Sequence, residues 1–525
     1  MTGEKQTAYD EVHYPTVAYE QTHPDRLATI ATILGMRPAP VERCRVLELA
    51  CGDGANLISM AHGLPESEFV GLDIASEPIG VGTQMIADLG LKNVQLGVVD
   101  LMDFRADGAP FDFIIAHGLY SWAPSPVRDR ALAIFEECLA PNGVAYVSYN
   151  AFSGCHIRDV ARRMMMYHVR SIPDPRVKIE QARALLQFIA TSKDEPLDLY
   201  RTILFGEHEM AVKRSDGGLY HDDLNPFNQP FYFHEVLEQA SKHNLQFLGE
   251  ADFSEMHPKG FTPEVQGVLL QMDPVMREQY LDFLTCRCFR STLLCRREVP
   301  LDHRARPLTV RGVYASFEGG PILSASDIAS TDSATFQNRK GNSIQTDRPI
   351  LKAALSRLGG CWPRALRFED LLPASRDIMA RGGTADDRES AEDASELCVL
   401  LLSCYAAGVV ELHTWAPPVV AEISERPIAS SLARYQCDHD KRLTTLWHRG
   451  VDLDTDLARQ LVVLLDGTRN RSALAEALTA LVQSGKTSLV DDGKSITDAE
   501  LVRGRIEEKF PEMLNALART ALLVG

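Results

Sequence analysis

Short apolar segments alternate with amphipathic ones from Arg45 to Tyr149, and this alternation constrains the fold more than any other feature of the sequence. Each apolar segment is five or six residues long and apolar almost throughout, as expected of strands buried on both faces of a sheet. The predicted strands are Val46–Ala50, Phe69–Ile74, Val94–Val99, Phe113–His117 and Val144–Tyr149. The predicted helices are Asn56–Gly63, Ile79–Leu89 and Arg130–Leu139. The alternation predicts an α/β fold with a doubly wound, mostly parallel sheet.

The sequence beyond this sheet predicts an insertion and a return to the same sheet. Residues 155–230 have a helical pattern and form the predicted insertion. Two later segments, Leu245–Gly249 and Phe289–Arg296, are predicted as strands at the far edge of the sheet. The core domain is therefore expected to span residues 1–300.

The second half of the chain predicts three further parts. Residues 301–345 are rich in Gly, Ser, Thr and Asp and are predicted to form a linker with some strand. Residues 346–420 read as two helices, a long apolar helix and a strand, an order typical of a winged-helix-like domain. Residues 421–525 predict a C-terminal helical domain in which Pro511 breaks or kinks the last helix.

The composition of the chain indicates which kinds of partner and which cellular compartment to expect. The net charge of −18 and the lack of a basic stripe argue against a general nucleic-acid binder and favour a basic or neutral substrate. The eleven cysteines lack metal-ligand spacing, so no metal is expected. The longest apolar run, Leu397–Val410, has fourteen residues and is too short to span a membrane. The first fifteen residues lack an apolar stretch, so we expect a cytoplasmic protein.

The turn between the first strand and the first helix carries the strongest functional signal. It reads Glu48-Leu49-Ala50-Cys51-Gly52-Asp53-Gly54-Ala55-Asn56. Gly52 and Gly54 allow a sharp bend and a close approach of the backbone to a ligand. Glu48 is a carboxylate inside an apolar strand, which is costly unless a cationic group stabilises it. A nicotinamide-binding fold is the alternative, but Leu57 occupies the position of its last glycine.

Acidic residues also end the next two strands. Asp73, followed by Ile74, can accept both hydroxyls of a ribose. Asp100 can accept an adenine amino group, with Leu101 against the ring. Taken alone, each aspartate is more typical of a turn or a helix cap than of a ligand contact. Because one such signal follows each of three successive strands, the three together predict a nucleoside site at the carboxyl ends of the strands.

These stretches resemble the motifs of class I S-adenosylmethionine (SAM)-dependent methyltransferases over residues 45–150, with Ala50 in place of the first glycine of the usual motif. The resemblance implies a Rossmann-like core and SAM as the cofactor. The predicted cofactor-binding residues are Glu48, Ala50, Cys51, Gly52, Gly54, Asn56, Asp73, Ile74, Asp100, Leu101 and His117. His117 is equally compatible with packing on the cofactor and with a place in the core.

Four residues are predicted to act on the acceptor: Tyr149, Asn150, Trp122 and Tyr14. Tyr149 and Asn150 end the fifth strand and either orient the nucleophile or cap the strand. Trp122, with Tyr120, forms an acceptor wall or packs in the core. Tyr14, with Arg26, folds over the cofactor as a lid or simply packs.

A wider set of motifs resembles one family over nearly the whole chain. The motifs are Thr22-His23-Pro24-Asp25-Arg26, His117-Gly118, Ser121-Trp122, Ser148-Tyr149-Asn150, Tyr220-His221-Asp222-Asp223-Leu224, Phe289-Arg290-Ser291-Thr292 and Leu465-Asp466-Gly467-Thr468-Arg469. They are similar to bacterial methyltransferases that carry a methyltransferase regulatory domain, a group that includes the outer-membrane-protein lysine methyltransferases. The resemblance implies a regulatory segment at residues 215–300, a homodimer formed through the helical insertion, and protein lysine as the acceptor.

Three functions remain open from the sequence. The first is methyl transfer to lysine side chains of a protein. The second is N- or O-methylation of a small metabolite, and the third is SAM binding without catalysis. The acidic and glycine residues of the turn and strand ends favour cofactor binding, but they do not separate the first two functions.

Overall fold

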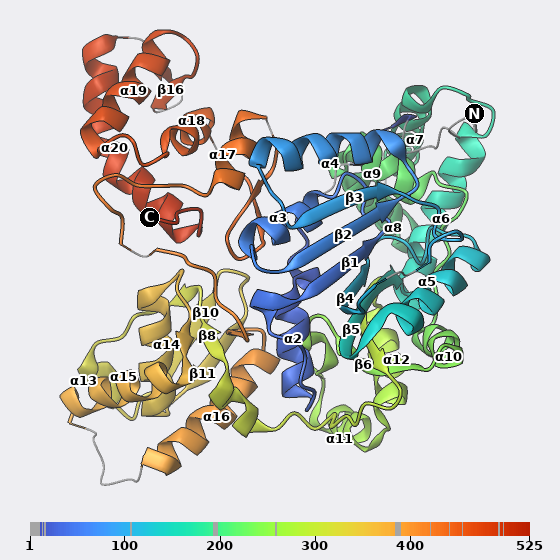
Figure 1. The fold of residues 1–525 in the computed structure, drawn as a ribbon, viewed down its shortest axis with the longest axis horizontal. Coiled ribbons are helices and arrows are strands. Elements are labelled where there is room, and N and C mark those ends of the chain that lie inside the picture. Colours follow the sequence, from blue (N-terminus) through green and yellow to red (C-terminus); the bar gives the residue numbers. More distant parts are fainter. Residues whose placement is uncertain are drawn as a thin grey trace.

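The computed structural model describes residues 11–525 except 13, 15–16, 106–107, 193–197, 258–259, 384–389, 421, 440, 454, 492–493 and 497. A seven-stranded sheet with the strand order β3-β2-β1-β4-β5-β7-β6 forms the centre (Figure 1). The strands are β1 (Arg45–Leu49), β2 (Glu68–Asp73), β3 (Val94–Val98), β4 (Phe111–Ala116), β5 (Leu139–Asn150), β6 (Leu245–Glu250) and β7 (Phe289–Arg296). The first five pair in parallel, and β7 runs antiparallel to β5 and β6. The predicted Rossmann-like sheet, with its two later strands at the far edge, is confirmed.

Helices cover both faces of this sheet because successive strand residues point to opposite sides. Val46 of β1 belongs to the apolar core beneath α2 (Pro24–Ile33), α3 (Ala55–Gly63) and α4 (Ser76–Leu89). Its neighbour Leu47 belongs to the core beneath α5 (Ser125–Cys138) and α10 (Phe233–Lys242). The carboxyl ends of the parallel strands are left open between these layers.

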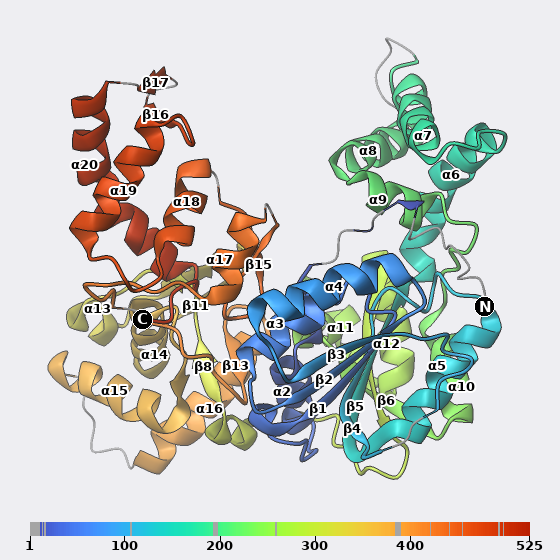
Figure 2. The ribbon, with the colours of Figure 1, turned by 45° about the horizontal axis from the view of Figure 1, so that its top comes forward.

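The insertion after β5 forms a separate group of helices. They are α6 (Phe152–Val169), α7 (Pro175–Ala190), α8 (Leu199–Lys213), α9 (Asp216–Gly218) and the π-helical turn η3 (Leu219–Asp223). They have their own small core, which includes Met165, Leu186 and Leu204. Figure 2 shows that these helices project from the sheet on the side opposite the C-terminal region.

After the insertion, the chain returns to the sheet edge through α10, β6, η4 (Phe253–Met256), α11 (Pro263–Gln271), α12 (Pro274–Thr285) and β7. Arg290 of β7 is fully buried and forms ion pairs with Glu250, Glu278 and Asp282. This cluster fixes α12 against the edge strands.

Residues 301–345, predicted as a linker, instead belong to a folded middle region. Strand β8 (Tyr314–Ser316) pairs with both β12 (Leu366–Arg367) and β13 (Glu411–His413). The other elements are η5 (Pro307–Gly312), β9 (Gly319–Gly320), α13 (Ala325–Ala329), β10 (Ala334–Asn338), β11 (Ser343–Thr346), α14 (Pro349–Cys361), α15 (Phe368–Arg381) and α16 (Ser390–Ala406). The weak sequence pattern reflects strands of two to five residues, too short for clear alternation. The helix–helix–long helix–strand order predicted for 346–420 is present as α14, α15, α16 and β13.

The C-terminal region is mainly helical and has its own core. It contains α17 (Ser431–Asp438), β14 (Leu443–Thr444), β15 (Gly450–Val451), α18 (Asp456–Leu464), α19 (Arg471–Gln483), β16 (Leu489–Asp491), β17 (Lys494–Ile496) and α20 (Ala499–Arg519). The last helix continues through Pro511, so the predicted break is wrong, while the alternative of a kink stays a prediction. The helix packs along its length in this core.

The start of α2 joins the sheet domain to the middle region. His23 caps α2 through its side chain, and Pro24 follows in the first turn. The buried Asp25 carboxylate accepts hydrogen bonds from the backbone N–H groups of Thr414 and Trp415, each at 2.8 Å, and contacts His413 at 2.7 Å. These hydrogen bonds therefore anchor the middle region to the start of α2.

Candidate functional site

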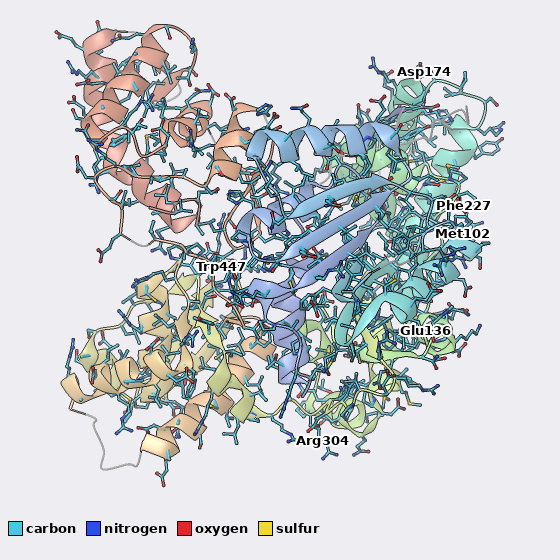
Figure 3. The ribbon with its side chains drawn as sticks, in the orientation of Figure 1. Met102, Glu136, Asp174, Phe227, Arg304 and Trp447 are labelled. Carbon is cyan, nitrogen blue, oxygen red and sulfur yellow. The ribbon has the colours of Figure 1, made fainter. Side chains whose placement is uncertain are left out.

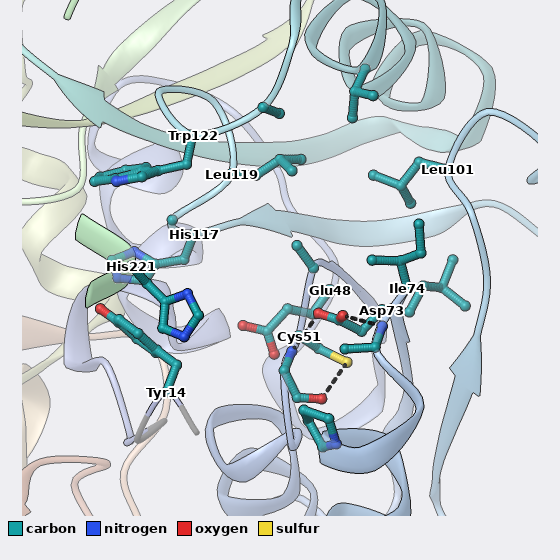
Figure 4. Close-up of a pocket in the computed structure, with 18 of the residues that line it drawn as sticks. Tyr14, Glu48, Cys51, Asp73, Ile74, Leu101, His117, Leu119, Trp122 and His221 are labelled. Atoms are coloured by element: carbon teal, nitrogen blue, oxygen red, sulfur yellow. Dashed lines mark hydrogen bonds between the residues drawn. The ribbon is translucent and has the colours of Figure 1, made fainter. Parts of the chain in front are cut away.

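A cavity of about 660 Å³ lies at the carboxyl ends of β1 to β4. It brings together ten of the eleven predicted cofactor residues, all except Gly54, and three of the four predicted acceptor residues, all except Tyr149. Figure 4 shows Glu48, Asp73, Ile74 and Leu101 on one side and Tyr14, His221 and Trp122 on the other. We call the first group the strand-end wall of the cavity and the second group the acceptor wall.

The turn after β1 winds through three left-handed residues. Ala50, Gly52 and Gly54 have φ angles of 57°, 59° and 70°. Ala50 thus adopts a conformation that favours glycine, consistent with its place at the usual glycine position of the motif. A side chain at Gly54 would meet Leu96 at 2.8 Å. Gly54 therefore allows close packing of the turn on β3, and it does not line the cavity itself.

Glu48 is the titratable group of the strand-end wall that burial affects most. One carboxylate oxygen accepts a hydrogen bond of 2.8 Å from the Asn56 amide. The other, Oε2, is buried and has no hydrogen-bond partner among the described residues. Burial is the main cause that raises the pKa of Glu48 to about 8. A cationic group in the cavity would supply the missing partner of this carboxylate.

Asp73 is held at the tip of β2 by the turn. Its carboxylate accepts hydrogen bonds from the backbone N–H groups of Gly52 at 2.8 Å and Ala75 at 2.9 Å. These bonds fix the position of the carboxylate at the cavity. Beside it, Ile74 lines the cavity and is 53% exposed.

The residues after β3 complete an apolar slot. Leu101 is buried and lines the cavity near Ile74. Asp100 is exposed at the same edge, and its carboxylate accepts a 2.9 Å hydrogen bond from the Met102 backbone N–H. The slot thus combines apolar side chains with a carboxylate at its edge, which suits a purine ring.

His117 lies between the two walls as a neutral ring. Burial lowers its pKa to about 4. Its Nδ1 lies 3.0 Å from the Tyr146 hydroxyl, and its ring packs on Tyr19 with the centroids 4.0 Å apart. The His117 ring therefore lines the cavity, as one prediction had it, and also packs on core residues, as the alternative had it.

The acceptor wall consists of aromatic rings around a carboxylate. Trp122 lines the cavity, and its indole N–H is buried without a hydrogen-bond partner among the described residues. The Tyr14 hydroxyl hydrogen-bonds the Asp222 carboxylate. Burial, followed by the nearby Asp223, raises the pKa of Asp222 to about 6. A carboxylate of this kind remains mostly ionised at neutral pH and attracts an amine.

Asn150 connects this wall to the end of β5. Its backbone N–H donates to Ser121 at 2.8 Å, and its amide donates to Asn228 at 2.9 Å. Asn228 in turn donates to the Asp222 backbone carbonyl at 2.6 Å. The end of β5 therefore positions η3, which carries Asp222.

One prediction about this wall is wrong, that for Tyr149, and for Tyr120 and Arg26 the structure agrees with the alternative of simple packing. Tyr149 faces away from the cavity: its ring is fully buried and its hydroxyl lies 3.0 Å from Thr292, because strand residues alternate between faces and Asn150 takes the cavity side. Tyr120 packs on Phe231 in the core. Arg26 is not a lid, since it forms an ion pair of 3.0 Å with Glu411 of the middle region.

The sequence did not single out several cavity residues. They are Tyr19, Met102, Arg158, His221, Asp222, Cys288 and Phe289. His221 and Asp222 stood within the quoted motif around the acidic pair Asp222-Asp223, which was the available signal. Phe289, which reaches the cavity from β7, also began a quoted motif, whereas nothing local in the sequence reveals that Arg158 reaches it from α6.

The cavity residues fit a nucleoside cofactor that carries an amino group. The unpartnered Glu48 oxygen, the fixed Asp73 carboxylate and the apolar slot at Ile74 and Leu101 supply the three kinds of contact such a molecule needs. The cavity volume of about 660 Å³ lies within the range of small-molecule sites. Among the described residues, no group of His, Cys, Asp and Glu side chains is arranged to hold a metal ion.

Comparisons with known families agree with this site. A methyltransferase-domain model matches residues 40–194, and a model described as a predicted methyltransferase regulatory domain matches residues 215–296. A model described as the C-terminal winged-helix domain of PKMT matches residues 425–522. The last match falls in the part predicted as a helical domain, after the part predicted to be winged-helix-like.

Individual relatives extend the similarity over the whole chain. "Uncharacterized protein RP789" of Rickettsia prowazekii (strain Madrid E) is 30% identical over 524 residues, covering 98% of this chain and 93% of that protein. Two structures of PKMT2 from Rickettsia typhi, one in complex with AdoHcy, align with a TM-score of 0.86 and 27% identity. They cover 98% of this chain and 100% of theirs.

The sheet and its strand-end cavity define an enzyme of the class I SAM-dependent methyltransferases. Within this class, the chain belongs to the family that combines the methyltransferase domain with a methyltransferase regulatory domain, together with RP789. No helix in the described part of the chain has the length and apolar character needed to cross a membrane.

Proposed function

We propose that the protein transfers the methyl group of SAM to the side-chain amino group of lysine residues in a protein. The observation that carries this proposal is the acceptor wall, where the Asp222 carboxylate lies among aromatic side chains that include Tyr14 and Trp122. Aromatic faces and a carboxylate together suit a cationic alkylamine. The similarity to PKMT2, whose abbreviation denotes a protein lysine methyltransferase, supports the same acceptor.

The strand-end wall is proposed to hold SAM, which supplies a methyl group on a cationic sulfur when it is bound. Glu48 Oε2 receives the amino group, Asp73 accepts the ribose hydroxyls, and the slot at Ile74 and Leu101 receives the adenine, with Asp100 at its edge. The neutral His117 adds no positive charge beside a cationic cofactor.

The acceptor wall is proposed to prepare the lysine amine. An ammonium group must lose one proton before its nitrogen can form a bond to carbon, and its unperturbed pKa is about 10.4. Asp222 attracts the ammonium and receives that proton on its carboxylate, since its raised pKa of about 6 makes it a stronger base than an ordinary aspartate. Trp122 and Tyr14 exclude water around the alkyl chain, which further favours the neutral amine.

The test is methyl transfer from labelled SAM into a mixture of cell-envelope proteins and into a small-molecule extract. We expect label in protein, recovered after acid hydrolysis as methylated lysine. Label confined to the small-molecule extract would contradict the lysine proposal and favour a metabolite methyltransferase. Tight SAM binding without transfer to either fraction would favour a non-catalytic role.

We also propose that the protein forms a homodimer through the helical insertion. Its helices expose large apolar side chains, among them Tyr167 at 68%, Phe188 at 71% and Leu199 at 79%. Exposed apolar groups on neighbouring helices are typical of protein interfaces. Light scattering after size exclusion should give twice the chain mass for the wild type, and the mass of one chain for Phe188→Asp combined with Leu199→Asp.

We place the enzyme in the cytoplasm. All eleven cysteines are free thiols, including the exposed Cys286 and Cys288. Free thiols persist in the reducing cytosol, whereas oxidising compartments favour disulfides. Fractionation should recover the protein with cytosolic markers.

A further inference from the structure

A turn of the C-terminal region reaches the back of the strand-end wall. The turn connects β14 to β15 and carries His448, which is buried and has a left-handed φ of 57°. Its Nε2 lies 2.9 Å from the Asn56 side-chain oxygen, although 392 residues separate the two in sequence. Figure 3 shows the adjacent Trp447 where the C-terminal region, the middle region and the sheet domain meet.

The hydrogen bonds around Asn56 fix the direction of this contact. Its amide nitrogen donates to Glu48 Oε1 at 2.8 Å. Its side-chain oxygen accepts from the Tyr19 backbone N–H at 2.9 Å. Because that oxygen accepts only, His448 Nε2 must carry a hydrogen and donate. Hydrogen bonds thus run from His448, which donates to Asn56, to Glu48, which accepts from Asn56.

The His448 bond helps to hold the Asn56 amide in one of its two possible orientations. In the observed orientation the amide nitrogen uses its two hydrogens at the same time, toward Glu48 Oε1 at 2.8 Å and toward the Thr22 hydroxyl at 3.1 Å. A flip that exchanges the amide oxygen and nitrogen would remove the bond to Glu48. The His448 donor on the Asn56 oxygen, together with the Tyr19 backbone N–H, opposes this flip.

The turn is itself fixed by two other parts of the chain. The Trp447 indole donates to the Pro363 carbonyl of the middle region at 2.9 Å. The Leu446 backbone N–H donates to the Ala521 carbonyl, just beyond α20, at 2.9 Å. The His448 ring also packs 5.1 Å from that of His23 at the start of α2. The position of His448 therefore depends on how the C-terminal region docks.

We propose that His448 is a positioning residue of the cofactor site: by donating to Asn56 it orients the amide that holds Glu48, so SAM affinity depends on the docked C-terminal region. The proposal rests on the role proposed above for Glu48. Displacement of the turn, for example by a partner bound to the C-terminal region, would weaken cofactor binding without changing any residue that touches the cofactor.

The experiment is calorimetric binding of S-adenosylhomocysteine to the full chain and its variants. We expect His448→Ala to weaken binding about tenfold, the effect of losing one buried hydrogen bond. His448→Gln, whose amide nitrogen can take the place of Nε2, should restore affinity to within about threefold of wild type. The exposed His439→Ala, in the same region but outside the chain of bonds, should bind like wild type.

A second arm separates positioning from general loosening of the fold. In an Asn56→Ala background, His448→Ala should change the affinity by less than about twofold, because the residue through which it acts is gone. Wild-type affinity of His448→Ala, no rescue by glutamine, or full additivity with Asn56→Ala would each overturn the proposal. Glu48→Gln distinguishes a failure of this proposal from a failure of the role proposed for Glu48. Unchanged cofactor affinity of Glu48→Gln would refute the role of Glu48. Weakened affinity of Glu48→Gln together with wild-type affinity of His448→Ala would refute only the role of His448.

Discussion

The strand-end wall and the acceptor wall of the same cavity are built in different ways. The strand-end wall comes from residues 48–101, where each functional side chain lies at or just after the carboxyl end of one strand of a regular sheet. The acceptor wall gathers Tyr14, Trp122, Asn150, Asp222 and Phe289 from parts of the chain up to 275 residues apart. The first wall therefore reflects the fold of the whole class, while the second depends on the insertion and the edge strands. Cofactor binding and acceptor binding should respond separately to mutation.

The largest expected effect is on the acceptor wall. Asp222→Asn removes the carboxylate that is proposed to attract and deprotonate the lysine, so kcat/KM for a protein acceptor should fall about 100-fold or more. Affinity for S-adenosylhomocysteine should stay within about twofold of wild type, because Asp222 lies on the opposite wall. Steady-state kinetics and calorimetry on the same preparation give both values. A loss of cofactor affinity as large as the loss of kcat/KM would contradict the separate roles of the two walls.

Asp73→Ala is the matched change on the strand-end wall. The variant loses a carboxylate held at the cavity by Gly52 and Ala75. Cofactor binding should weaken by roughly 1–3 kcal/mol, since a half-buried acceptor to the ribose is gone. The KM for the acceptor at saturating SAM should change little. Unchanged cofactor affinity in calorimetry would show that Asp73 does not contact the ribose.

The pH dependence of cofactor binding tests the strand-end wall separately from the acceptor wall. Because the pKa of Glu48 is about 8 in the cofactor-free protein, only about one molecule in ten carries the ionised carboxylate at pH 7. If the ionised form receives the amino group, affinity rises about tenfold from pH 6 to pH 7, and binding at pH 7 releases close to one proton. Calorimetry in two buffers of different ionisation enthalpy measures the released proton.

Glu48→Gln is the control for this titration. It should bind weakly and show a nearly flat affinity between pH 6 and pH 7. A wild-type affinity that does not change over this range would mean that Glu48 stays protonated in the complex, and that its free oxygen does not pair with a cation.

The sequence predicted most of the strand-end wall because its signals are local. Glu48, the glycine turn, Asp73 and Asp100 each stand at a fixed distance from a recognisable strand. Parallel strands place such positions at one edge of a sheet whatever follows in the chain. Even Ala50, which departs from the usual motif, takes the left-handed backbone expected at that position, with φ of 57°.

The acceptor wall was less predictable because its contacts are long-range. Asp222 reaches the cavity only because the insertion returns through η3, where Asn228 and Asn150 connect it to β5. His448 lies in another region altogether. The middle strands β8 and β12 were missed as pairing partners because three-residue and two-residue strands carry no periodic pattern.

The smallest expected effect concerns Tyr149, which the sequence placed at the acceptor and the structure places in the core. The Thr292 hydroxyl donates to Glu250 at 2.8 Å, so it accepts the hydrogen of the Tyr149 hydroxyl. Tyr149→Phe should cost about 1 kcal/mol of unfolding free energy, the value of one buried hydrogen bond, and leave kcat within about twofold of wild type.

Asn150→Ala is the adjacent control for Tyr149→Phe, since its side chain lines the cavity and supports Asn228. It should lower kcat/KM for the acceptor several-fold more than Tyr149→Phe does. Urea unfolding and steady-state kinetics distinguish the two variants. A large loss of kcat in Tyr149→Phe at unchanged stability would mean that this hydroxyl, and not the Asn150 amide, faces the acceptor, and that the register of the β5 end differs from the one described.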